Sequence, residues 1–139
     1  IKRFNVRDGV GIKLWQRAGL KFGILTARTS HIVKLRATEL GVDIVRQGFE
    51  EKLIVAQEIM SDLELTAEQV CYIGDDFPDL PVMRTVGLAI AVDDACHEVR
   101  AAAHHITKLS GGQGAVREAI EAITKAKGVW DDVIRKYTG

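Results

Sequence analysis

Five short apolar runs, separated by segments with helical spacing, constrain the fold of this chain most. The runs are continuous rather than alternating in polarity, as in strands that are buried on both faces of a parallel sheet. They occupy residues 20–27, 42–45, 70–74, 88–92 and 104–107. This alternation predicts an α/β fold, a parallel sheet with right-handed helical crossovers.

The segments between the runs are predicted to be helices or helical turns. They cover residues 11–19, 30–41, 51–65, 66–69, 93–103, 115–128 and 130–137. Ser30 and Thr66 are the expected N-terminal caps of two of them, and Gly19 ends the first. Residues 1–7 are charged and alternating, unlike a buried strand.

Composition excludes several classes of protein. The 139 residues suit one domain, and 19 basic residues balance 19 acidic ones. This balance argues against nucleic-acid and anionic-membrane partners, and the apolar runs are too short to span a bilayer. The two cysteines have no metal-ligand spacing. Without a recognisable leader, we expect a cytoplasmic enzyme or binding domain.

Three carboxylates, Asp75, Asp76 and Asp79, directly follow the apolar run 70–74. Mg²⁺ binds oxygen ligands and keeps water and phosphate ligands besides one or two carboxylates. Asp75 leaves the strand first and is the predicted direct ligand, and Asp79, one turn later, is predicted to hold a metal-bound water. Asp76 is the third candidate. The alternative is a helix N-terminus whose acidic residues suit the helix dipole.

A hydroxyl and an ammonium are expected at the same edge of the sheet. The strand in the first run ends in Thr26, and Lys52 begins the helix after residues 46–50. Ligands of parallel sheets collect at the carboxyl ends of the strands. There Thr26 and Lys52 would stabilise charge on phosphate oxygens during phosphoryl transfer. Otherwise Thr26 is a helix cap and Lys52 a solvated residue.

The order of these motifs resembles the haloacid dehalogenase superfamily. The whole chain is similar to the 3-deoxy-D-manno-octulosonate 8-phosphate phosphatase family. The similar blocks are "FNVRDGVGI" (4–12), "ILTARTS" (24–30), "QGFEEK" (47–52), "YIGDDFPDLPVM" (72–83), "VGLAIAV" (86–92) and "GGQGAVRE" (111–118). The resemblance implies a Rossmannoid three-layer fold without a large cap domain. It also implies a cytoplasmic, homotetrameric Mg²⁺-dependent phosphatase of lipopolysaccharide biosynthesis that acts through an aspartyl-phosphate.

One expected motif is absent. The family's nucleophile lies in a DxD motif on a strand upstream of residues 4–12, and that strand lies between those ending at Thr26 and Asp75. Asp8 does not match the nucleophile. We therefore expect a longer native polypeptide, two unpaired strand edges within these 139 residues, and an unstable, inactive chain without the missing strand.

The resemblance also implies substrate-binding residues. Arg28 would bind the carboxylate of an octulosonate, and Arg7 and Gly41 are further candidates. Arg28 with Gly41 favours the eight-carbon sugar acid over sialic-type 9-phosphates.

Two other interpretations remain open. One is a phosphatase of sialic-type (KDN or N-acylneuraminate) 9-phosphates, or a phosphatase-like domain of an acylneuraminate cytidylyltransferase. The other, from a different class, is a non-catalytic, metal-binding oligomerisation module. The tail 128–139 would pack on its own domain or on a neighbour.

Overall fold

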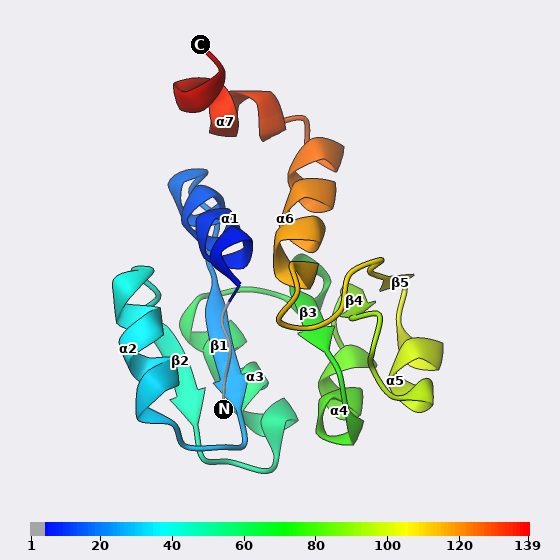
Figure 1. The fold of residues 1–139 in the computed structure, drawn as a ribbon. Coiled ribbons are helices and arrows are strands. Elements are labelled where there is room, and N and C mark those ends of the chain that lie inside the picture. Colours follow the sequence, from blue (N-terminus) through cyan, green and yellow to red (C-terminus); the bar gives the residue numbers. More distant parts are fainter. Residues whose placement is uncertain (1–4) are drawn as a thin grey trace.

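The computed structural model describes residues 5–139, so the first four residues of the charged, alternating segment 1–7 lie outside the described residues. All five predicted strands are present (Figure 1). They are β1 (Gly23–Thr26), β2 (Ile44–Gln47), β3 (Cys71–Gly74), β4 (Leu88–Ala91) and β5 (His105–Ile106). β2 begins two residues later than predicted, because the Val42 amide donates to the Ala37 carbonyl (2.8 Å) at the preceding helix end.

The predicted helices are also present, as is the predicted helical turn, the 3₁₀ turn η1 (Ala67–Gln69). The helices are α1 (Val6–Arg17), α2 (His31–Glu39), α3 (Lys52–Asp62), α5 (His97–Ala102), α6 (Ala115–Ala126) and α7 (Trp130–Thr138). The structure adds the 3₁₀ turn η2 (Phe77–Asp79) and the short helix α4 (Leu80–Met83) after β3. Ser30 caps α2 as predicted, accepting a hydrogen bond from the Val33 amide.

The predicted start of the first helix, at Gly11, was wrong. α1 begins at Val6, because the Asn5 side chain accepts hydrogen bonds from the amides of Arg7 and Asp8. Residues 6–10, which we expected to precede the helix, therefore belong to it.

The strands form two parallel sheets rather than one. β1 pairs with β2, and β3 and β5 pair with opposite edges of β4. Within residues 5–139, β1 and β3 do not pair with each other, so each has one unpaired edge, as the sequence predicted. A largely apolar groove of about 420 Å³ is lined by residues of both strands, among them Leu25 and Tyr72.

Two apolar clusters form the core. The larger lies around β3 and β4 and includes Val82, Ala89 and Val99, which are completely buried. The smaller joins α1, α2 and α6 and includes Ile12 and Ile120. α7 extends from the end of α6 and has no fully buried residue (Figure 1). No helix among residues 5–139 is both long enough and apolar enough to cross a membrane.

Candidate active site

The loop after β3 is folded tightly against the strand that precedes it. A Cβ atom at Gly74 would lie 2.7 Å from the Cβ of Asp79 and 2.7 Å from the Sδ of Met83, so only glycine fits. Asp76 caps η2 by accepting a hydrogen bond from the Phe77 amide (2.8 Å). Together these contacts turn Asp79 back over the end of the strand.

Asp79 is buried at the centre of a four-donor hydrogen-bond cluster. Its Oδ1 accepts from the Tyr72 hydroxyl (2.6 Å) and from the Lys52 ammonium (2.8 Å). Its Oδ2 accepts from the backbone amides of Asp75 (2.9 Å) and Asp76 (3.2 Å). With only 4% of its side chain exposed, Asp79 is a charge that protein donors satisfy in place of water.

This cluster shifts two pKa values in opposite directions. Burial alone would raise the pKa of Asp79, but the hydrogen bonds from Lys52, Tyr72 and the Asp75 amide lower it below the ordinary range. Burial, and then the negative charge of Asp79, raise the pKa of Tyr72. The cluster therefore holds an ionised carboxylate, with Tyr72 as a neutral hydrogen-bond donor.

Lys52 is the first residue of α3. A cation at a helix N-terminus is disfavoured by the helix dipole. The ion pair with Asp79 offsets this cost and holds the ammonium, whose side chain is only 12% exposed, at the carboxyl end of β3. The sequence prediction that Lys52 and the carboxylate cluster converge is therefore confirmed in geometry.

Asp75 differs from Asp79, because its side chain is exposed. Loss of part of its hydration, and then the neighbouring Asp79 carboxylate, raise the pKa of Asp75, while Lys52 opposes this shift. Among residues 5–139, no three His, Cys, Asp or Glu side chains form a metal-binding group. Mg²⁺ requires only one or two carboxylates. The oxygens of Asp75 are exposed and lie near another negative charge, so they fit a hard cation.

Thr26 and Arg28 lie at the carboxyl end of β1. The Thr26 hydroxyl is half-buried and accepts a hydrogen bond from the Arg28 amide (3.2 Å), and the Arg28 side chain is exposed. Within the described part of the chain, no hydrogen bond or ion pair connects Thr26 with the Asp79 cluster. Thr26 and Arg28, after β1, are thus a separate group from the Asp79 cluster after β3.

Gly41 is not brought to this edge of the sheet. It follows α2 with a φ of 71°, and its amide bonds to the Thr38 carbonyl, which is a helix C-terminal cap. α2 runs back from the end of β1 toward the start of β2, so Gly41 lies at the opposite end of α2 from Thr26 (Figure 1).

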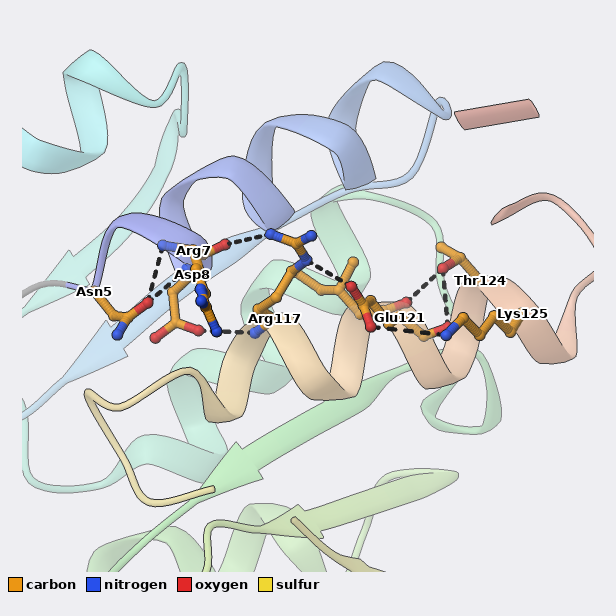
Figure 2. Close-up of polar contacts among 8 residues, drawn as sticks. Asn5, Arg7, Asp8, Arg117, Glu121, Thr124 and Lys125 are labelled. Carbon is orange, nitrogen blue, oxygen red and sulfur yellow. Dashed lines mark hydrogen bonds and ion pairs between the residues drawn. The ribbon is translucent and has the colours of Figure 1, made fainter. Parts of the chain in front are cut away.

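Arg7 and Asp8 lie where α1 contacts α6 (Figure 2). The Arg7 carbonyl accepts a hydrogen bond from the Arg117 side chain (3.4 Å), and Asp8 accepts one from the Arg117 amide (2.8 Å). Asp8 therefore supplies the N-terminal capping acceptor for α6 that Gly114, which precedes this helix, lacks.

Sequence reasoning missed Tyr72 as a member of the site. It lies in an apolar strand, where an aromatic residue is expected to pack. The available signal was its hydroxyl, because a buried tyrosine usually finds a polar partner.

Comparison with known proteins gives the family. A profile of the haloacid dehalogenase-like hydrolases matches residues 35–120. The 3-deoxy-D-manno-octulosonate 8-phosphate phosphatase of Yersinia pestis is 42% identical over 91% of this chain and 68% of its own length.

Two solved structures show the same relationship. A probable YrbI family phosphatase from Pseudomonas syringae superimposes with a TM-score of 0.97 at 45% identity, covering 100% of this chain and 79% of that one. The Moraxella catarrhalis 3-deoxy-D-manno-octulosonate 8-phosphate phosphatase, in complex with magnesium, phosphate and KDO, gives 0.96 at 38% identity, covering 99% and 79%. The chain therefore belongs to the haloacid dehalogenase-like hydrolases, in the family of 3-deoxy-D-manno-octulosonate 8-phosphate phosphatases.

Proposed function

We propose that this protein is a Mg²⁺-dependent phosphatase that hydrolyses 3-deoxy-D-manno-octulosonate 8-phosphate to KDO and phosphate. The observation that carries the proposal is the cluster at the end of β3, where Lys52 forms an ion pair with Asp79 beside the exposed Asp75. The relatives named for this reaction, and the Moraxella catarrhalis structure with magnesium, phosphate and KDO, support it.

Each residue has a distinct proposed role. Asp75 is the direct metal ligand, and Mg²⁺ neutralises phosphate charge when bound. Asp79 fixes the ammonium of Lys52 and the backbone of the Asp75 loop. Asp79 and Asp76 support the metal site without binding the metal directly. Lys52 and Thr26 donate hydrogen bonds to the phosphate oxygens.

The nucleophile is proposed to come from a further strand of the same polypeptide. The open edges of β1 and β3 line the apolar groove and leave backbone groups for an inserted strand to pair with. An aspartate at the end of that strand would lie between Thr26 and Asp75 and would attack phosphorus while the bond from phosphorus to the sugar oxygen breaks. The sugar oxygen takes a proton and leaves as the hydroxyl of KDO, and water then cleaves the aspartyl-phosphate to phosphate and the free aspartate. With this strand, residues 1–139 would form a single domain.

Substrate choice is assigned to the exposed guanidinium of Arg28, which suits the carboxylate of an octulosonate. Arg7 and Gly41 remain candidates for the substrate site. Gly41 lies at the opposite end of α2 from Thr26, so a neighbouring subunit would have to bring it to the carboxyl end of β1. We propose a homotetramer in the cytoplasm, acting in lipopolysaccharide biosynthesis.

The test combines the intact mass of the native protein with phosphate release from 3-deoxy-D-manno-octulosonate 8-phosphate. We expect a mass above 15.3 kDa and release that requires Mg²⁺. Asp75→Ala should abolish release, whereas Asp43→Ala, which removes an exposed acid just before β2, should not.

Three results would count against the proposal. Faster release from a sialic-type 9-phosphate would reassign the substrate, and a fused nucleotidyltransferase domain would indicate a cytidylyltransferase. A native mass of 15.3 kDa with Mg²⁺ binding but no release would indicate a non-catalytic module.

A further inference from the structure

The described part of the chain has two tyrosines, and their hydroxyl groups have very different surroundings. Tyr137 is 60% exposed and its hydroxyl accepts a hydrogen bond from Arg17 (2.8 Å). Tyr72 lines the groove between the sheets, and its hydroxyl donates to the buried Oδ1 of Asp79 (2.6 Å). That oxygen is the same one that binds the ammonium of Lys52 (2.8 Å).

Sharing one oxygen couples the two donors. The backbone amides of Asp75 and Asp76 hold Oδ2, so the orientation of the carboxylate depends on the groups that hold Oδ1. Lys52 is a flexible side chain, whereas the Tyr72 ring is fixed by its strand and has only two side-chain torsions. Tyr72 is therefore the rigid donor that determines where Oδ1 lies, and Oδ1 in turn determines where the ammonium lies.

We propose that Tyr72 is a positioning residue, which orients Asp79 and through it aims Lys52 at the phosphate of the substrate. The inference rests on the proposed phosphatase function. A charged donor stabilises a transition state most when it is already in place before the reaction. An ammonium that moves freely therefore stabilises the transferring phosphoryl group less well.

A purely structural role for the hydroxyl predicts a different outcome from a positioning role. Tyr72→Phe keeps the ring in the groove and removes only the hydrogen bond. If the bond only stabilises the fold, its loss lowers the free energy of unfolding and leaves kcat unchanged. If the bond aims Lys52, its loss lowers kcat only as long as Lys52 is present.

The experiment is a double-mutant cycle in the full-length native enzyme, with Tyr72→Phe, Lys52→Ala and the double variant, and Tyr137→Phe as the control. We expect Tyr72→Phe to lower kcat about tenfold and to change KM by less than about twofold. Added to Lys52→Ala, the same change should have no further effect on kcat. Tyr137→Phe should behave as the wild type. An equal loss of kcat in both backgrounds, or no loss at all, would overturn the proposal.

A second measurement separates this proposal from the proposed function. The ammonium of a lysine held in an ion pair exchanges its protons slowly and gives a ¹⁵N-resolved NMR signal. We expect this signal of Lys52 in the wild type and Tyr137→Phe, and its broadening or loss in Tyr72→Phe. If the wild type releases no phosphate but the signal changes as expected, the positioning role stands and the phosphatase assignment fails. An unchanged signal contradicts the positioning role, whatever the activity.

Discussion

Replacement of Lys52 by methionine tests whether the ion pair with Asp79 stabilises the fold. The variant keeps most of the apolar stem and removes the charge. Asp79 would then be a buried carboxylate without a cation, because 4% exposure of its side chain leaves little room for water to replace the ammonium.

The expected loss in the free energy of unfolding depends on the hydrogen bonds that Asp79 retains. Removal of one partner of a buried ion pair costs roughly 3–5 kcal/mol. The hydroxyl of Tyr72 and two backbone amides still donate to Asp79, so we expect the low end, about 3 kcal/mol. Lys125→Met is the matched control: this lysine is 57% exposed, 3.7 Å from Glu121 and 5.6 Å from the centre of the Trp130 ring. Its loss should cost about 1 kcal/mol or less.

Urea denaturation, followed by circular dichroism in the presence of EDTA, measures the loss in unfolding free energy of both variants. Urea, unlike a salt, does not screen the ion pairs. The pH dependence identifies their cause. The pKa of Asp79 is lowered in the folded state, so its stabilisation is present above the unfolded pKa of about 3.9 and is lost as the pH falls through the folded pKa. The difference between wild type and Lys52→Met should therefore shrink below about pH 4. Equal losses in Lys52→Met and Lys125→Met, or a difference between wild type and Lys52→Met that is no smaller at pH 3 than at pH 7, would refute this reasoning.

Three further changes probe the site and its support. Gly74→Ala should displace Asp79, because the added Cβ would lie 2.7 Å from that residue's Cβ; phosphate release should fall strongly, and retained activity would contradict the packing argument. Asp8→Ala removes the acceptor for the Arg117 amide and should cost about 1 kcal/mol in urea denaturation, as other helix caps do. The raised pKa of Asp75 means that its ionisation weakens the fold as the pH rises, so Asp75→Asn should gain stability over the wild type at pH 7 but not at pH 3, in metal-free denaturation.

The strands and the order of the site residues could be predicted from the sequence, since both depend on local patterns. Buried parallel strands are continuous apolar runs, and polar residues that end such runs must meet at one edge of the sheet. The contact of Lys52 with Asp79 follows from this topology, although the two residues are 27 positions apart.

The beginning of α1 could not be predicted in this way, since tertiary packing overrides local preference there. Two glycines, Gly9 and Gly11, weaken the helical pattern of residues 6–12. In the structure both are in close contact with other helices: a Cβ at Gly9 would lie 2.5 Å from the guanidinium of Arg36, and one at Gly11 would lie 3.0 Å from Arg117. These contacts depend on the placement of α2 and α6, which no local window contains.

Charge balance explains why three carboxylates can stand together at the end of β3. Asp79 takes the charge of Lys52, and Asp76 caps a helical turn through the Phe77 amide, so Asp75 keeps a negative charge without a protein cation of its own. A phosphate dianion that approached Lys52 would be repelled by Asp75. A divalent cation held by Asp75 would reverse the sign of this interaction, because it would attract the phosphate oxygens. The ion pair and the metal would then have separate tasks: the pair fixes one positive donor in place, and the metal would make the remaining acid a site of attraction.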